Sequence, residues 1–311
     1  MSAVNTLIRH RMASEHAPRI PQVTEHLVGA GGKRVRPLLT LASAAINGYE
    51  GDHDVKLAAT VEFIHTATLL HDDVVDESEQ RRGRPTANLL WDNQSSVLVG
   101  DYLFARSFQL MVETDSLRVL DILANAAAVI AEGEVLQLSV ARDTSVAEGT
   151  YIKVVRGKTA ALFSAATEVG AVIAGADEHR VEAMHTYGDA LGIAFQMADD
   201  LLDISGSDAT GKNTGDDLRE GKMTMPVILG LKLASDTERA KIVAVISKPN
   251  PSDADVSEVL AILNSCGAVE ETRARALAWS AAARDALDLV PQGPITDALR
   301  DLSDYVVARI S

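Results

Sequence analysis

Apolar residues recur about every three to four positions along almost the whole 311-residue chain, which is the spacing of buried and amphipathic helices. No segment alternates apolar and polar residues between turn signals, so strands are not expected. We therefore predict an all-α fold. The expected helices cover residues 3–15, 20–29, 35–47, 54–76, 94–113, 116–138, 150–171, 178–205, 222–233, 236–247, 254–265, 267–289 and 293–310.

Turn signals divide these helices without dividing the chain into domains. Thr150 and Ser252 are candidate N-cap residues, because a hydroxyl side chain can accept a hydrogen bond from an amide in the first helical turn. Glycine and proline mark the loops, as in the Arg-Gly-Arg-Pro segment 82–85. No low-complexity linker interrupts residues 20–235, so we expect a single domain over residues 1–311.

Composition narrows the class of protein. Aromatic residues make up only 4% of the chain, which favours helix over strand. The net charge of −15 argues against nucleic acid as the main partner, because phosphate backbones attract basic surfaces. The single cysteine excludes an intramolecular disulfide framework. The polar N-terminus lacks the apolar core of a signal peptide, and the longest apolar run contains Glu168, so we expect a cytoplasmic protein without membrane spans.

Two copies of Asp-Asp-x-x-Asp, at residues 72–76 and 199–203, are the strongest chemical signal. Carboxylates four residues apart share one face of a helix, and such a face is unfavourable unless a cation occupies it. Mg²⁺ prefers oxygen ligands and is usually held by one or two carboxylates plus substrate phosphates. The alternative is a pair of solvated acidic helix ends, but both motifs end apolar stretches and both precede basic loops. The motifs therefore predict a magnesium site for a diphosphate.

Basic residues gather in a few segments of this acidic chain. Lys33, Arg34 and Arg36 lie on a glycine-rich turn before an apolar helix, where the backbone can approach an anion closely. Ten of the 29 Lys and Arg residues fall in such segments, at positions 33, 34, 36, 81, 82, 84, 158, 212, 219 and 222. Local cations and metal, not the net charge, would set the field at the site.

These segments resemble the all-trans isoprenyl diphosphate synthases. The resemblance covers residues ~25–235 in order, whereas the C-terminal quarter matches only in helical character. Its segments are 31–37, 62–86, 97–103, 133–138, 158–163, 195–203 and 211–226. It implies one all-α domain of about 12–13 helices around a deep apolar cavity, usually as a homodimer.

The resemblance also implies the ligands and their residues. About three Mg²⁺ ions per active site would join an allylic prenyl diphosphate to the protein. The metal set implied is Asp72, Asp73, Asp76, Asp199, Asp200 and Asp203. The cations of the allylic diphosphate site would be Arg81, Lys158, Lys212 and Lys222, with Thr159, Gln196 and Lys158 beside the allylic carbon. Isopentenyl diphosphate would bind Gly32, Lys33, Arg36, His65 and Arg82 without metal.

The implied reaction is ionisation, condensation and elimination. Metal and cations neutralise the departing diphosphate, the alkene of isopentenyl diphosphate attacks the allylic cation, and a proton is lost. No side chain need act as a nucleophile, and the sequence offers no convincing Ser-His-Asp or Cys-His set.

Product length is read from the residues before the first motif. In the family, bulky side chains there block the growing tail, whereas here they are the small Ala67 and Thr68. A helical wheel places Thr68 beneath Asp72 but not Ala67, so the argument for Ala67 rests on the resemblance. Together with the run 129–138, this favours a C40–C50 product for a quinone side chain, with C20 as the alternative.

Two other functions use similar sequences. A terpene cyclase would also ionise an allylic diphosphate, but it would lack the basic pocket of Lys33, Arg36 and Arg82. A non-catalytic partner subunit of a heteromeric synthase tends to lose its acidic motifs, and this chain keeps both.

Overall fold

The chain divides into two compact units in the computed structural model, which describes residues 1–29, 31–81, 83–205 and 214–309. The first unit contains Met1–Ala127, Leu162–Gly188 and Asp288–Thr296. The second contains Ala128–Ala161, Asp189–Leu287 and the chain from Asp297 onward. Each unit is thus assembled from segments far apart in sequence. The single domain over residues 1–311 stays a prediction.

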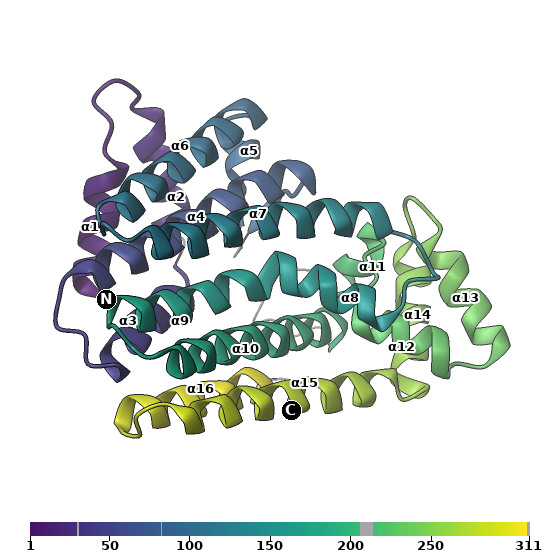
Figure 1. Cartoon of the computed structure of the whole chain (residues 1–311). Coiled ribbons are helices and arrows are strands. Elements are labelled where there is room, and N and C mark those ends of the chain that lie inside the picture. The colour runs from purple at the N-terminus through teal and green to yellow at the C-terminus, as the bar shows by residue number, and fades with distance from the viewer. Residues whose placement is uncertain (30, 82, 206–213, 310–311) are drawn as a thin grey trace. The chain divides into compact units, whose positions relative to one another are not determined.

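Both units are helical, which confirms the all-α fold (Figure 1). Helices that begin in the first unit are α1 (Ser2–Met12), α2 (Arg19–Gly29), α3 (Val35–Ile46), α4 (His53–Val75), α5 (Ala87–Leu90), α6 (Asn93–Val112), α7 (Leu117–Val140), α10 (Glu178–Ser205) and α16 (Pro294–Ala308). Helices that begin in the second unit are α8 (Glu148–Val155), the π-helix η1 (Arg156–Ala160), α9 (Ala161–Ile173), α11 (Asp216–Glu220), α12 (Met225–Leu233), α13 (Asp236–Ile246), α14 (Asp253–Ser265), α15 (Ala268–Ala286) and the 3₁₀ helix η2 (Leu287–Leu289).

The structure corrects the sequence prediction at a few helix ends. The expected N-cap Thr150 is wrong, because α8 already begins at Glu148, whose carboxylate is held by Lys232 and Arg275 in the first turn. The helix expected from residue 222 begins at Met225 instead, after the N-cap Thr224. Pro226 explains this shift, because a residue without an N–H belongs in the first turn.

Short elements also escaped the sequence pattern. Strands β1 (Gln80–Arg81) and β2 (Arg84–Pro85) form a hairpin in which Arg81 pairs with Arg84. Helices α5 and α11 are too short to carry a periodic signal. The range predicted as one helix over 150–171 is interrupted by the π-helix η1.

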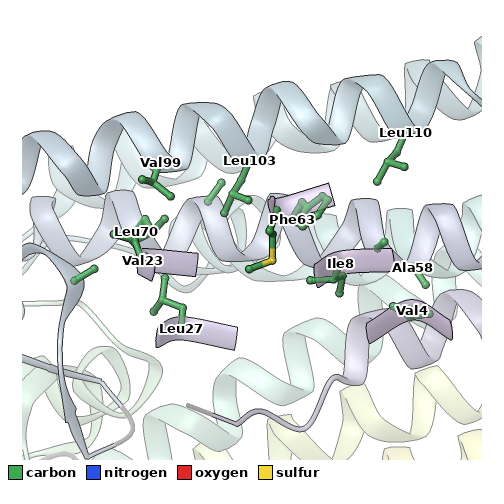
Figure 2. Close-up of a cluster of buried hydrophobic side chains, with 14 residues drawn as sticks. Val4, Ile8, Val23, Leu27, Ala58, Phe63, Leu70, Val99, Leu103 and Leu110 are labelled. Atoms are coloured by element: carbon green, nitrogen blue, oxygen red, sulfur yellow. The ribbon is translucent and has the colours of Figure 1, made fainter. Parts of the chain in front are cut away.

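In the first unit, α4 and α6 pack along most of their lengths (Figure 1). Figure 2 shows Val99 and Leu103 pointing from α6 toward Leu70 and Phe63 of α4, and all four side chains are buried. Burying an aliphatic or aromatic side chain of this size contributes about 1.5–3 kcal/mol, so this packing holds α4 firmly. The end of α4 carries the first acidic motif.

Gly100 lets α6 approach α4 next to that motif. A β-carbon at this position would lie 2.2 Å from Nε2 of His71. The same His71 nitrogen donates to the carbonyl of Val97 at 3.1 Å. The glycine of the segment 97–103 therefore has a packing function, and His71 fixes the turn of α4 that precedes Asp72.

In the second unit, α12 packs against α13, α14 and α15 (Figure 1). Residues Met225–Gly230 of this helix are all buried. Gly230 allows the close contact, since a β-carbon there would lie 2.3 Å from a methyl group of Leu263. None of the described helices combines the length and apolar character needed to cross a bilayer.

Candidate active site

The first acidic motif presents two carboxylates at the end of α4. Asp72 and Asp76 are partly exposed and lie one helical turn apart, with the Asp76 amide donating to the Asp72 carbonyl at 2.8 Å. Asp76 is the C-cap of α4. A helix C-terminus favours cations, so a metal ion there would be stabilised by both the carboxylates and the helix end.

The middle residue of the same motif turns inward. Asp73 is fully buried, and its Oδ1 accepts hydrogen bonds from Nε and Nη2 of Arg81 at 2.8 and 2.7 Å. The Asp73 carbonyl also accepts from the Ser78 amide. Asp73 thus anchors Arg81, on strand β1, close to Asp72 and Asp76. The metal role of Asp73 and the diphosphate role of Arg81 stay predictions.

The glycine-rich turn before α3 is held by its central arginine. Gly31 and Arg34 both have a positive φ, of 78° and 49°. Arg34 forms an ion pair with the buried Glu62 of α4 and donates to the Val28 carbonyl at 3.1 Å. Lys33 and Gly32, the neighbouring residues of the turn, are both exposed.

Two predicted isopentenyl diphosphate residues come together in this unit. Nη1 of Arg36 lies 3.4 Å from Nε2 of His65, and the Arg36 guanidinium stacks 4.4 Å from the ring centroid of Phe163. His65 and Arg81 also line a surface hollow with Glu62 and Thr66. Arg82, predicted for the same ligand, lies outside the described residues.

The predicted product-length residues occupy different sides of α4. Ala67 is fully buried in the cluster that α4 shares with α6. Thr68 is partly exposed, on the side of Asp72, and its hydroxyl donates to the His65 carbonyl at 2.8 Å. Their roles in product length stay predictions.

The second acidic motif, in the second unit, also has two partly exposed aspartates and a buried aspartate between them. Asp199 and Asp203 are partly exposed and lie one turn apart on α10. Asp199 accepts a hydrogen bond from Nη2 of Arg309 at 2.8 Å, and the Arg309 guanidinium lies 4.4 Å from the Phe195 ring centroid. Asp203 accepts from the Asp216 amide at 3.1 Å, at the start of α11.

Asp200, between them, is only 3% exposed. Its Oδ2 accepts from the Tyr151 hydroxyl at 2.6 Å and from the Met225 amide at 3.4 Å, and its Oδ1 accepts from Nε2 of Gln196 at 3.0 Å. Burial, and after it the charge of Asp217, raise the pKa of Asp200, whereas its three hydrogen bonds lower the pKa. The net result is a pKa of about 7. Burial and the charge of Asp200 raise the pKa of Tyr151 well above its usual value. The predicted metal role of Asp200 is untested, and both of its oxygens already have protein donors.

Lys158 and Thr159 lie on the π-helix η1, a rare conformation that often occurs at functional sites. Nζ of Lys158 donates to the Glu134 carboxylate of α7 at 2.7 Å. The Thr159 hydroxyl donates to Oε1 of Gln196 at 2.8 Å. Lys158, Thr159 and Gln196, which are predicted to lie beside the allylic carbon, therefore all belong to the second unit, and Thr159 contacts Gln196 directly.

Lys222 lies after α11, where its ammonium is 3.9 Å from the Asp217 carboxylate and also pairs with Glu220. Lys212, predicted to share its ligand, lies outside the described residues.

The carboxylates suit magnesium bound together with a substrate. Among the described residues, no three His, Cys, Asp or Glu side chains form a ready-made metal cage. Each motif instead offers one pair of partly exposed carboxylates. That matches the way Mg²⁺ is held by one or two carboxylates and completed by phosphate and water.

Sequence reasoning missed four residues that position this machinery. They are Glu62, Glu134, Tyr151 and Arg309, which contact Arg34, Lys158, Asp200 and Asp199 respectively. Glu62 and Glu134 fall inside the segments that carry the resemblance, and a charged residue within an apolar run was the available signal. Tyr151 and Arg309 gave no such signal.

Comparison with known proteins identifies the family. The polyprenyl synthetase family model matches residues 17–263. The chain belongs to the polyprenyl synthetase family. This polyprenyl synthetase is 42% identical to octaprenyl diphosphate synthase of Escherichia coli over 310 residues, which cover 99% of this chain and 95% of that protein.

Solved structures agree with this assignment. The chain is 63% identical to a decaprenyl diphosphate synthase from Rhodobacter capsulatus, with a TM-score of 0.96 and coverage of 100% and 96% of the two chains. It is 48% identical to a polyprenyl synthase from Caulobacter crescentus complexed with calcium and isoprenyl diphosphate, with a TM-score of 0.96 and coverage of 100% and 95%.

Proposed function

We propose that this polyprenyl synthetase condenses isopentenyl diphosphate with an allylic prenyl diphosphate and repeats the step to a C40–C50 product. It is a prenyltransferase, a long-chain all-trans polyprenyl diphosphate synthase. The observation that carries the proposal is the repeated pair of partly exposed aspartates at a helix end, Asp72 with Asp76 and Asp199 with Asp203. Such pairs suit a substrate whose phosphates complete a metal's coordination.

The resemblance implies that both carboxylate pairs bind the allylic diphosphate through Mg²⁺ and that Arg81, Lys158 and Lys222 supply the cations. When bound, the metal neutralises charge on the leaving diphosphate, and removing one such contact typically costs about 2.7–4 kcal/mol. Arg81 and Lys158 are each held by a protein carboxylate at 2.7 Å, which fixes their charge in place before substrate arrives. This geometry supports preorganised stabilisation of the departing group.

Isopentenyl diphosphate would bind Lys33, Arg36 and His65. Arg36 is stacked on Phe163 and touches His65, so its planar guanidinium is oriented for bidentate contact with a phosphate. The exposed ammonium of Lys33 would supply a point charge from the turn that Arg34 holds. The alkene carried by this substrate would then attack the allylic cation.

The protein would act as a homodimer. Val97, Leu98, Phe108 and Val112 of α6 are exposed at 39%, 66%, 43% and 62%. They fall within about 100° of one another around the helix, which makes an apolar stripe. Apolar patches of this kind commonly mark protein–protein contacts, and a two-fold contact would cover the stripe with its own copy. Light scattering after size-exclusion chromatography should give twice the 33.1 kDa chain mass, whereas the mass of one chain would contradict the dimer.

Incubation of the purified chain with Mg²⁺, farnesyl diphosphate and radiolabelled isopentenyl diphosphate tests the proposed reaction. We expect labelled products longer than the primer, and none when metal is removed by a chelator. A terpene cyclase would instead release hydrocarbon or alcohol without isopentenyl diphosphate. A chain that is inactive with both substrates and metal would indicate a non-catalytic partner subunit.

A further inference from the structure

A continuous hydrogen-bond chain links the buried Tyr151 to Thr159. Tyr151 donates to Asp200 at 2.6 Å, Gln196 donates to Asp200 at 3.0 Å, and Thr159 donates to Gln196 at 2.8 Å. All of these residues belong to the second unit, and Tyr151, Asp200 and Thr159 are buried. Tyr151 and Asp200 lie at the end of this chain remote from Thr159.

The direction of every hydrogen bond in this chain follows from Asp200. In the ionised form of Asp200 both carboxylate oxygens accept, and Oδ2 receives hydrogen bonds from the Tyr151 hydroxyl and from the Met225 amide, which can only donate. The group of Gln196 that faces Oδ1 must therefore be its NH₂. The Gln196 carbonyl is consequently turned toward Thr159, and the Thr159 hydroxyl must donate to it.

We propose that Tyr151 and Asp200 are positioning residues that fix the direction of this chain, so that Thr159 offers oxygen lone pairs and no hydrogen to a developing allylic cation. The inference rests on the proposed function and on the place beside the allylic carbon that the resemblance implies for Thr159. Asp200 then acts through Gln196 and Thr159, not as a metal ligand. A fixed dipole costs no reorganisation when charge develops, which is why its direction matters.

Asp200→Asn should reverse the direction of these hydrogen bonds without breaking them. Because the Met225 amide can only donate to the Oδ2 position, the carbonyl of the introduced amide should occupy that position and its NH₂ should face Gln196. The Gln196 amide then flips, its NH₂ donates to Thr159, and the Thr159 hydrogen is released toward the substrate. We expect the single-turnover rate to fall about 10²-fold, with KM for isopentenyl diphosphate unchanged.

A second substitution should restore the direction. In the double variant Asp200→Asn with Gln196→Glu, the new carboxylate accepts from both the NH₂ of the introduced amide and the Thr159 hydroxyl. We expect its single-turnover rate to be at least about tenfold higher than that of Asp200→Asn. Gln196→Glu alone sets two carboxylates face to face and should be impaired, so recovery in the double variant would be specific to the direction of the chain.

Tyr151→Phe tests the remote end of the chain. It removes one of the three donors to Asp200, and we expect kcat to fall by about tenfold or less without a change in KM for isopentenyl diphosphate. Tyr49→Phe is the control, since that hydroxyl also has one hydrogen bond, which it accepts from the His53 amide at 3.2 Å, in the other unit. In a Thr159→Val background, Tyr151→Phe and Asp200→Asn should each change the rate by less than about threefold, because the residue through which they act is absent.

Calorimetry of inorganic diphosphate binding with Mg²⁺ supplies a measurement that does not depend on turnover. Unchanged metal-dependent binding in Asp200→Asn, together with the rescue, is the expected result. Loss of that binding, or no recovery in the double variant, would overturn the inference. An inactive wild-type chain would instead refute the proposed function, whereas an active wild type with a fully active Asp200→Asn variant would refute only this inference.

Discussion

Gly133 of α7 and Gly157 of η1 bring two helical backbones into direct contact. A β-carbon on Gly157 would lie 2.8 Å from Cα of Gly133, and one on Gly133 would lie 2.6 Å from the Lys158 amide nitrogen. The residues that follow these glycines, Glu134 and Lys158, form the 2.7 Å ion pair. The glycine contact therefore sets the position of a cation proposed to bind the leaving diphosphate.

Gly157→Ala should reduce activity by moving η1 away from α7. The clash is with backbone, which cannot rotate away, so we expect destabilisation of about 1–3 kcal/mol as well as a lower kcat. Gly149→Ala is the matched control, because its β-carbon would meet nothing within 4 Å and alanine is the better helix former. Urea denaturation and steady-state kinetics of both variants check this prediction. Equal kinetics for the two variants would contradict the positioning role of the glycine contact.

Arg34→Ala should weaken the binding of isopentenyl diphosphate and the fold together. It breaks the ion pair of Arg34 with the buried Glu62, and breaking a buried ion pair by removing one residue typically costs about 3–5 kcal/mol. The turn that carries Lys33 and precedes Arg36 loses its anchor, so KM for isopentenyl diphosphate should rise more than KM for the allylic substrate.

The double variant Arg34→Ala with Glu62→Ala separates these two effects. Removal of both charges should recover most of the stability, as judged by urea denaturation, but not the KM. Recovery of both would mean that the pair serves stability alone.

Ala67→Tyr should shorten the products. Ala67 is fully buried on α4, five residues before Asp72, and a tyrosine there must displace neighbouring side chains. Ala87→Tyr is the control, because Ala87 is equally buried in the same cluster but lies on α5. Chromatography of the dephosphorylated products compares the two variants. Unchanged chain length in Ala67→Tyr would refute Ala67 as part of the product tube.

Acid should remove the stabilising contribution of Asp255. This carboxylate accepts from Nζ of Lys248 at 2.6 Å and from the Ser252 amide and hydroxyl at 2.9 and 2.8 Å, which lowers its pKa from 3.8 to about 2. Because the folded-state pKa lies below the unfolded value, the contribution is complete well above pH 3.8 and is lost as the pH falls toward 2. Asp255→Asn should therefore be less stable than wild type at pH 7, and the difference should shrink on acidification. Free energies of unfolding measured from pH 7 to pH 3 test this, and a constant difference would contradict it.

Much of the fold could be predicted because long apolar patterns dominate it. The predicted range 178–205 coincides with α10, and 54–76 differs from α4 by one residue at each end. The capping signal at Ser252 is also confirmed, with Asp255 completing the capping box. The failures lie where tertiary contacts override local signals. Glu148, fixed by Lys232 and Arg275 from distant helices, moves the start of α8 ahead of Thr150.

The sequence predicted those parts of the site whose residues belong to the motifs of the family. The contact of Arg36 with His65 followed from the resemblance, as did the grouping of Thr159 with Gln196. The inward turn of Asp73 and Asp200 did not follow, because a motif gives residue types and not the side of the helix that each one uses. Tyr151 could not be found from sequence, since its partner lies 49 residues away.

The distribution of product lengths shows whether this polyprenyl synthetase extends its substrate to a C40–C50 chain. Wild-type enzyme is incubated with Mg²⁺, farnesyl diphosphate and an excess of radiolabelled isopentenyl diphosphate, and the dephosphorylated products are separated by reverse-phase chromatography. We expect all-trans products that end at C40–C50, with shorter chains only as intermediates that disappear with time. Products that stop at C20 and do not lengthen with time would contradict it.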